Sequence, residues 1–146
     1  MECQLHPDLK LDPLKDSGLV SVRLRIVTRE VLQYGNVDML SGFEISFKDF
    51  RYTSPLALNP SINATLKACT TQVIIRMDAT HTSALRAGLY FAAFLAQLAD
   101  GVVYMPRSDA YLDHEQALAH ITQEVKQYET ELPPEDWRVV PFSRWP

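Results

Sequence analysis

Four residues near the middle of the chain have side chains that could bind or activate a ligand: Asp78, His81, Thr82 and Ser83. They lie where a predicted strand ends and a predicted helix begins, which is the usual position of a ligand crevice in α/β units. An imidazole there can transfer a proton near neutral pH, and the first backbone N–H groups of a helix can hold an anion. Hydroxyl-bearing residues also suit the capping of a helix. A purely structural role is therefore the alternative interpretation of this crevice.

A second group of possible ligating residues lies further along the chain: His114, Glu115, His120 and Glu124. His120 and Glu124 are four residues apart and share a helix face, whereas the other two fall on different faces. The chain has no His-Glu-x-x-His motif, no glycine-rich phosphate loop and no Gly-x-Ser-x-Gly elbow. We therefore expect no bound metal and no cofactor, and the sequence favours a protein that is not an enzyme.

Acidic residues gather along the last predicted helix and the segment that follows it. The set is Glu115, Glu124, Glu129, Glu131, Glu135 and Asp136, and Trp137 comes directly after it. Carboxylates steer a basic partner, and an aromatic side chain at their margin can anchor that partner. These residues form the predicted partner-binding surface. The alternative is a solvated helix face whose tryptophan folds back onto the core.

Arginines also occur beside aromatic residues, as on a platform for single-stranded nucleic acid. Arg23 and Arg25 alternate with apolar residues and share one strand face. However, the chain carries 14 basic and 18 acidic residues, a formal charge of −4. A nucleic-acid-binding protein needs a concentrated basic surface for the phosphates. We therefore predict no nucleic-acid partner.

The elements that must position these residues are clearest in the second half of the chain. Thr71–Ala79 is predicted as a buried strand, and Ser83–Ala99 as a helix that is apolar around almost its whole circumference. Such a helix must be enclosed between other elements or lie in an oligomer interface. Gly101–Pro106 is predicted to return to the same sheet, and Asp113–Leu132 has the apolar stripe of an amphipathic helix.

The first half contributes two strands with alternating polarity, Leu19–Thr28 and Gly42–Phe50, and a short helix from Pro60 to Cys69. Together the elements predict an α+β fold. We expect a two-layer sandwich with a mixed sheet of about four strands and helices mainly on one face. The whole chain, residues 1–146, is predicted to be a single domain, with an extended N-terminal arm over residues 1–17 and an apolar C-terminal tail over residues 133–146 that packs on the domain.

Composition restricts where such a protein would act. Hydrophobic residues make up 47% of the chain and charged residues 22%, which is typical of a compact globular domain. The longest apolar stretch is shorter than the roughly 20 residues that span a bilayer, and the N-terminal residues do not resemble a signal peptide. Cys3 and Cys69 are far apart, with no metal-ligand spacing, so we expect free thiols. These features predict a cytoplasmic protein with no membrane association.

The segment LRAGLYFAAFLAQLADGVVYMP, residues Leu85–Pro106, resembles the helix-then-strand segment of small α+β bacterial proteins. Some of these proteins resemble immunity proteins of polymorphic or contact-delivered toxins. The resemblance covers about the central third of the chain and implies a class of protein without assigning any site residue. The leading hypothesis is therefore a protein that neutralises or regulates a partner by covering its surface, and the most specific form of this hypothesis has a basic toxin domain as the partner. The alternatives are a small enzyme or ligand-binding domain using the Asp78–Ser83 crevice, and a homo-oligomer subunit.

Overall fold

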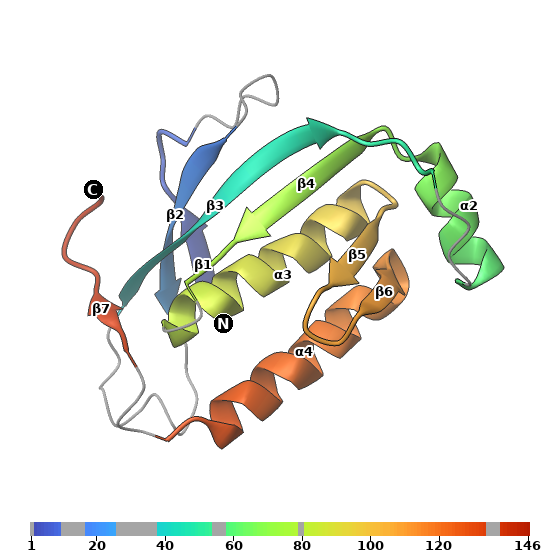
Figure 1. The fold of residues 1–146 in the computed structure, drawn as a ribbon. Helices are drawn as coiled ribbons and strands as arrows, with labels where there is room; N and C mark the ends of the chain where they lie inside the picture. The colour runs from blue at the N-terminus through green and yellow to red at the C-terminus, as the bar shows by residue number, and fades with distance from the viewer. Residues whose placement is uncertain (1, 10–16, 26–37, 54–57, 79–80, 134–137) are drawn as a thin grey trace.

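The computed structural model describes residues 2–9, 17–25, 38–53, 58–78, 81–133 and 138–146. Within them, four strands form a sheet in the order β1 (Glu2–Leu5), β2 (Gly18–Arg25), β3 (Met39–Asp49) and β4 (Thr71–Arg76). A two-residue strand, β7 (Val140–Pro141), also pairs with β3. The predicted α+β class is confirmed, and the helices cover mainly one face of the sheet (Figure 1).

All the strand pairs of the described sheet are antiparallel, so the expectation of a mixed sheet was wrong. The expected parallel strand, Gly101–Pro106, does not return to this sheet. Instead, β5 (Val102–Met105) pairs with β6 (Ala110–Asp113) in a separate two-stranded hairpin. The chain reverses just before β6, where Asp109 adopts a left-handed φ of 49°. The hairpin buries Val103, Met105 and Leu112 against the helices, and this burial replaces pairing in the main sheet.

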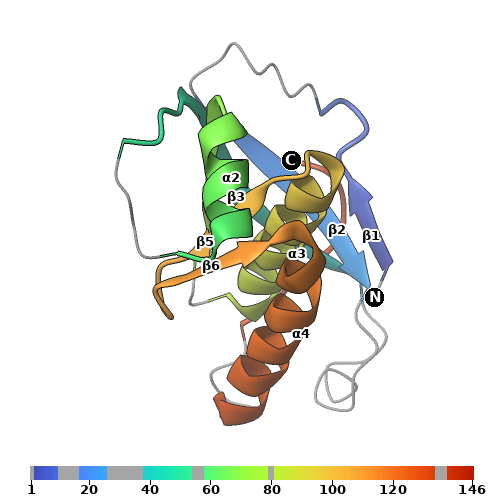
Figure 2. The ribbon, with the colours of Figure 1, turned by 90° about the vertical axis from the view of Figure 1, so that its right-hand side faces the viewer.

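Three helices complete the domain: α2 (Pro60–Ala68), α3 (Thr82–Leu98) and α4 (His114–Glu131). Helix α3 runs beneath the sheet, and α4 lies on the side of α3 that faces away from the sheet (Figures 1 and 2). One apolar cluster joins α3 to the sheet through Val20, Phe43 and Ala87, and Phe91 packs on that cluster. A second cluster joins α3 to α4 and the hairpin through Ala93 and Ile121. The apolar helix is thus enclosed on two sides, but Phe94 and Leu98 in its second half are exposed, so the enclosure is less complete than its sequence predicts.

Close packing of α3 depends on a residue without a side chain. A Cβ atom at Gly88 would lie 2.9 Å from Cε and 3.1 Å from Sδ of Met77, just beyond the end of β4. Helix α3 then ends through Asp100, which has a left-handed φ of 48°. The N–H of Gly101 donates to the carbonyl of Ala96 at 2.8 Å, which is the Schellman arrangement. The helix ends one residue before the predicted Ala99, and Asp100 takes the left-handed conformation that is most often taken by glycine at this position.

Helices α3 and α4 are antiparallel, as three cross-links between them show. Arg86 near the start of α3 pairs with Glu129 near the end of α4. In the middle, the Tyr90 hydroxyl lies 3.4 Å from the Thr122 hydroxyl. At the far end, Asp100 lies 3.9 Å from His114. The second half of α3 therefore lies beside the first half of α4.

Both ends of the chain lie on the sheet. Residues 2–5 of the predicted arm form β1, antiparallel to β2, while residues 10–16 are outside the described part. At the other end, the Trp145 ring lies 5.0 Å from both the His6 ring and the Phe142 ring. The described part of the tail, residues 138–146, therefore lies against the sheet and contacts the turn after β1.

Candidate functional site: a pocket at a break in the sheet

The candidate site lies where two short strands use the same edge of β3. Strand β2 pairs with residues 39–45 of β3, so β4 and β7 must share the opposite edge. Strand β4 pairs with Glu44–Asp49 and β7 with Met39–Leu40. The register therefore leaves Ser41, Gly42 and Phe43 with no paired residue on this edge among the described residues. Here the chain leaves β4 and enters α3, and the sheet is interrupted.

A cavity of about 340 Å³ occupies this break, and we call it the junction pocket. Its apolar lining residues come from β2, β3, α3 and the C-terminal segment. Its polar lining residues come from β2, from β3 and from the junction between β4 and α3. The lining residues are Leu19, Ser21, Leu40, Ser41, Gly42, Asp78, His81, Ser83, Ala84, Val140 and Pro146. Three of the four residues of the predicted Asp78–Ser83 crevice therefore line one cavity. Strands β2 and β3 and the C-terminal segment add walls that the local sequence does not reveal.

The titratable pair of the pocket is Asp78 and His81. Nδ1 of the imidazole lies 3.0 Å from Oδ2 of Asp78, and both side chains are partly exposed. When Nδ1 carries the hydrogen and donates it to the carboxylate, Nε2 carries the lone pair and can accept a proton or a hydrogen bond. The pair thus has the arrangement of an oriented imidazole beside a cavity.

The start of α3 differs from the expected capping pattern. His81 is the N-cap residue, and its side chain makes no capping hydrogen bond. Thr82 and Ser83 lie within the first helical turn and are buried. Thr82 does not line the pocket, and its buried hydroxyl has no hydrogen-bond partner within the described residues. The capping interpretation therefore does not account for these two residues.

Ser41 was not identified from the sequence. The predicted strand began at Gly42, whereas β3 begins at Met39 and extends past Ser41. Ser41 is opposite Val22 on the inward face of the sheet. Its Oγ is buried, and it has no hydrogen-bond partner among the described residues. An unsatisfied buried hydroxyl costs about 1–3 kcal/mol, so a ligand that bonds to it would gain affinity. The local signal was a serine at a position where the alternating pattern requires an apolar residue.

Gly42, next to Ser41, allows β2 and β3 to approach closely. A Cβ atom at this position would lie 2.9 Å from the backbone oxygen of Val20 on β2. A backbone atom within a sheet cannot move aside as the end of a flexible side chain can. Strands β2 and β3 thus approach closely here only because residue 42 lacks a side chain.

Within the described residues, the predicted acidic partner surface is not a continuous band. Glu129 is buried, and its carboxylate pairs with Arg86, with Oε1 accepting from Nε at 2.7 Å. Glu124 is half-buried, and its Oε2 lies 3.9 Å from Nε2 of His120. Glu115 and Glu131 are exposed. The other three predicted residues, Glu135, Asp136 and Trp137, are outside the described part of the chain. The inclusion of Glu129 in an exposed surface was therefore wrong, because its charge faces the interior.

The four residues considered for metal binding do not form one cluster in the described part of the chain, where only His120 and Glu124 lie close to each other. No group of three or more histidine, cysteine, aspartate or glutamate side chains there could hold a metal ion. Cys3 and Cys69 do not form a disulfide, and burial raises the pKa of the Cys3 thiol. Among the described helices, none is long and apolar enough to cross a membrane.

No family model, curated protein or solved structure matches this chain. The functional interpretation therefore rests on the geometry of the chain itself.

Proposed function

We propose that this protein binds a small ligand in the junction pocket. The observation that supports this proposal most directly is a cavity of about 340 Å³ that is lined by the Asp78–His81 pair and by Ser41, whose buried hydroxyl has no hydrogen-bond partner among the described residues. Ligand pockets commonly occupy about 300–1,000 Å³ and combine mostly apolar walls with a few oriented polar groups. The junction pocket has this composition, and its polar residues come from three separate parts of the chain: β2, β3 and the junction between β4 and α3.

The lining defines the chemistry of the ligand. Leu19, Leu40 and Val140 offer an apolar surface to the body of a small molecule. Ser41 and His81 are the lining residues that we assign to hydrogen bonds with a polar group of the ligand. A ligand with an apolar body and one hydrogen-bonding group fits both features. The Asp78–His81 pair would orient that group or exchange a proton with it, as a general base does.

A thermal-shift screen of small metabolites against the wild-type protein tests the proposal. Binding to the folded state alone raises the melting temperature as the ligand concentration increases. Each hit is then titrated against His81→Ala and against the matched control His114→Ala, which removes a half-buried imidazole near Asp100 at the opposite end of α3. We expect His81→Ala to weaken binding roughly tenfold, the value of one good hydrogen bond, and His114→Ala to leave it unchanged.

Two outcomes would count against the junction pocket. One is that none of the metabolites shifts the melting temperature of the wild-type protein. The other is that every hit binds His81→Ala and the wild-type protein equally well, which would place the binding elsewhere.

A second candidate function, the covering of a protein partner, is supported by a different observation. Phe94 and Leu98 are one turn apart on α3, and their exposed fractions are 48% and 86%. Because the two helices are antiparallel, these side chains lie at the same end of the helix pair as the exposed Glu115. An exposed apolar pair and an exposed carboxylate at the same end of the helix pair suit a partner with an apolar anchor and basic residues around it. In this proposal the protein is a cytoplasmic immunity protein that blocks a basic toxin domain.

Co-purification from the native host tests this second candidate. Tagged wild-type protein should retain a basic protein that is lost in a Phe94→Ser/Leu98→Ser variant and retained in the exposed control Tyr104→Ser. If the wild-type protein is recovered alone from cells that make the toxin, the immunity role is wrong. Light scattering distinguishes the third possibility, because a homo-oligomer that uses this surface would dissociate in the same double variant.

A further inference from the structure

Strand β4 leaves a long edge of the sheet uncovered. It is the last strand of the sheet, on the side opposite β1 (Figure 1). Among the described residues, β4 pairs with β3 and with no other strand. Its backbone makes no backbone–backbone hydrogen bond to a described residue outside this pairing. One row of backbone groups along β4 is therefore open to an incoming strand.

The hydrogen-bonding pattern shows which groups form this row. The backbone N–H of Phe50 donates to the carbonyl of Thr70 at 2.8 Å, one step beyond the last pair of the β3–β4 register. Bonded and non-bonded pairs alternate along an antiparallel ladder, so every second residue of β4, counted from Thr70, bonds to β3. The N–H and C=O groups of Thr71, Val73 and Ile75 therefore point away from β3.

The sequence of β4 is that of an interior strand. Val73, Ile74 and Ile75 are consecutive apolar residues, a pattern typical of strands covered on both faces, yet all three are only half-buried. Val73 and Ile75 pack against the cluster between the sheet and α3, and Ile74 lies on the other face. Natural edge strands are usually short, charged, bulged or interrupted by proline. From Thr71 to Ile75, β4 has a continuous register and no charged residue or proline, which indicates that another strand covers it.

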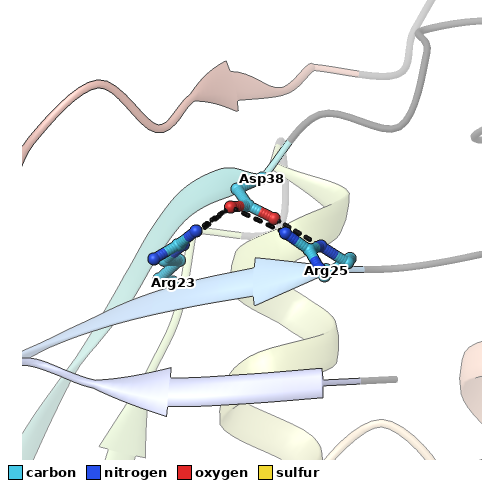
Figure 3. A network of polar contacts seen from close by, with 3 residues as sticks. All are labelled: Arg23, Arg25 and Asp38. Carbon is cyan, nitrogen blue, oxygen red and sulfur yellow. Dashed lines mark hydrogen bonds and ion pairs between the residues drawn. The ribbon is translucent and has the colours of Figure 1, made fainter.

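The opposite edge of the sheet has the protection that β4 lacks. Strand β1 has four residues, and Glu2 lies opposite Arg25 in its register with β2. Arg23 and Arg25 both donate to the carboxylate of Asp38, so charged groups gather beside β1 (Figure 3). Short length and charge both discourage the addition of a strand. The edge that favours pairing is therefore that of β4.

We propose that β4 pairs antiparallel with β4 of a second copy of this chain, so that the two sheets join into one. A two-fold axis perpendicular to the sheet brings the same edge onto itself. With Ile74 on this axis, Val73 lies opposite Ile75 of the second copy, and the N–H of each bonds to the C=O of the other. Ile74 then faces its own copy and Arg76 faces Gln72, so apolar residues meet apolar ones and no like charges meet. The second copy is the occupant that fits, because the edge is complementary to itself, and the pairing uses no residue of the junction pocket.

The mass of the full chain in solution is the first test. Sedimentation equilibrium over a range of concentrations should show a reversible change from 16.6 kDa to twice this mass. Hydrogen exchange followed by NMR locates the interface, because the amides of Val73 and Ile75 should exchange more slowly as the dimer forms. The amide of Leu5 is the control: His6 donates to Ser21, so by the same alternation the Leu5 N–H points away from β2. A single-chain mass at every concentration, which would leave the edge to a strand of another protein, would overturn the proposal. So would exchange at β4 that does not change as the dimer forms.

Two variants change the edge and keep the hydrogen bonds between β3 and β4. Val73→Pro removes an N–H that points away from β3, a position where proline is tolerated in an edge strand. Ile74→Lys places two like charges together at the axis, and lysine is a common protection of edge strands. Each variant should weaken the dimer roughly tenfold or more, with an unchanged circular dichroism spectrum. Leu5→Lys, which adds the same charge at the β1 edge where Leu5 is exposed, and Phe94→Ser/Leu98→Ser on α3 should leave the dimer intact. A dimer that persists in both β4 variants, or that is lost in either control, would overturn the proposal.

Discussion

Replacing Glu129 by alanine would leave the guanidinium of Arg86 buried between α3 and α4 without a counterion. The two side chains are 11% and 9% exposed and are joined by a bidentate contact. Removing one partner of a buried pair costs about 3–5 kcal/mol, out of the ~5–15 kcal/mol that stabilises a typical domain. For a chain of this size, that loss corresponds to a fall in melting temperature of about 10–15 °C.

Urea unfolding monitored by circular dichroism measures this cost. The double variant Arg86→Met/Glu129→Leu, which replaces the pair by apolar side chains, should unfold within about 2 kcal/mol of the wild type. This double variant can still be measured if the Glu129→Ala variant does not fold. The exposed control Glu131→Gln should change stability by less than about 0.5 kcal/mol. If Glu129→Ala costs less than about 1 kcal/mol, or the double variant is as unstable as the single one, then Arg86 and Glu129 do not form a buried pair.

Three further variants test other parts of the fold. Gly42→Ala should destabilise the sheet by about 1–3 kcal/mol in urea unfolding, because its Cβ would meet the Val20 carbonyl, whereas Gly18→Ala has no atom within 4 Å and should be neutral. Hydrogen bonds from Arg25 and then Arg23 hold the pKa of Asp38 below its ordinary value of 3.8. Its ionised form therefore contributes stability that is fully present above about pH 4 and is lost as the pH falls through the folded-state pKa. The difference in unfolding free energy between the wild type and Asp38→Asn should therefore shrink as the pH falls below about 4. A difference that does not change with pH would contradict the lowered pKa of Asp38. Asp113→Ala should lower the free energy of unfolding by about 1 kcal/mol, because Oδ1 of Asp113 accepts the backbone N–H of Gln116 at 2.8 Å at the start of α4. Unchanged stability in this variant would contradict the capping role of Asp113.

Short-range patterns in the sequence were sufficient to predict the α+β class and most of the elements. The alternation of Val20, Val22 and Leu24 is the buried face of β2. The continuous apolar stretch of α3 is enclosed because the sheet covers one side and α4 the other. Both features depend on residues within a few positions of each other, and such periodicity is visible in a single sequence.

Strand pairing could not be predicted in the same way, because it depends on contacts between distant parts of the chain. The segment around Val103 has the composition of a sheet strand, yet it pairs with β6 in a local hairpin. The four residues of β6 end at Asp113, which is also the N-cap of α4, so the helix signal concealed the strand.

The candidate site was predicted in part. Asp78, His81 and Ser83 do line one pocket, because a strand end followed by a helix start is a local feature. Ser41 was missed because its burial follows from β7 and β4 sharing one edge of β3. Glu129 was misplaced for a similar reason. Its partner Arg86 is 43 residues away, and a position on the helix does not by itself show which charges face inward.

The most direct test of the junction pocket compares Ser41→Ala and Thr82→Val, which each remove a buried hydroxyl that has no hydrogen-bond partner in the described part of the chain. Only Ser41 lines the pocket. The affinity of each for the best ligand from the thermal-shift screen is measured by calorimetry, together with the free energy of unfolding without ligand. Both variants should be more stable by about 1 kcal/mol, because an unsatisfied polar group is removed. Ser41→Ala should bind the ligand roughly tenfold more weakly, while Thr82→Val binds it as the wild type does; equal affinity in all three proteins would contradict a ligand site at this break in the sheet.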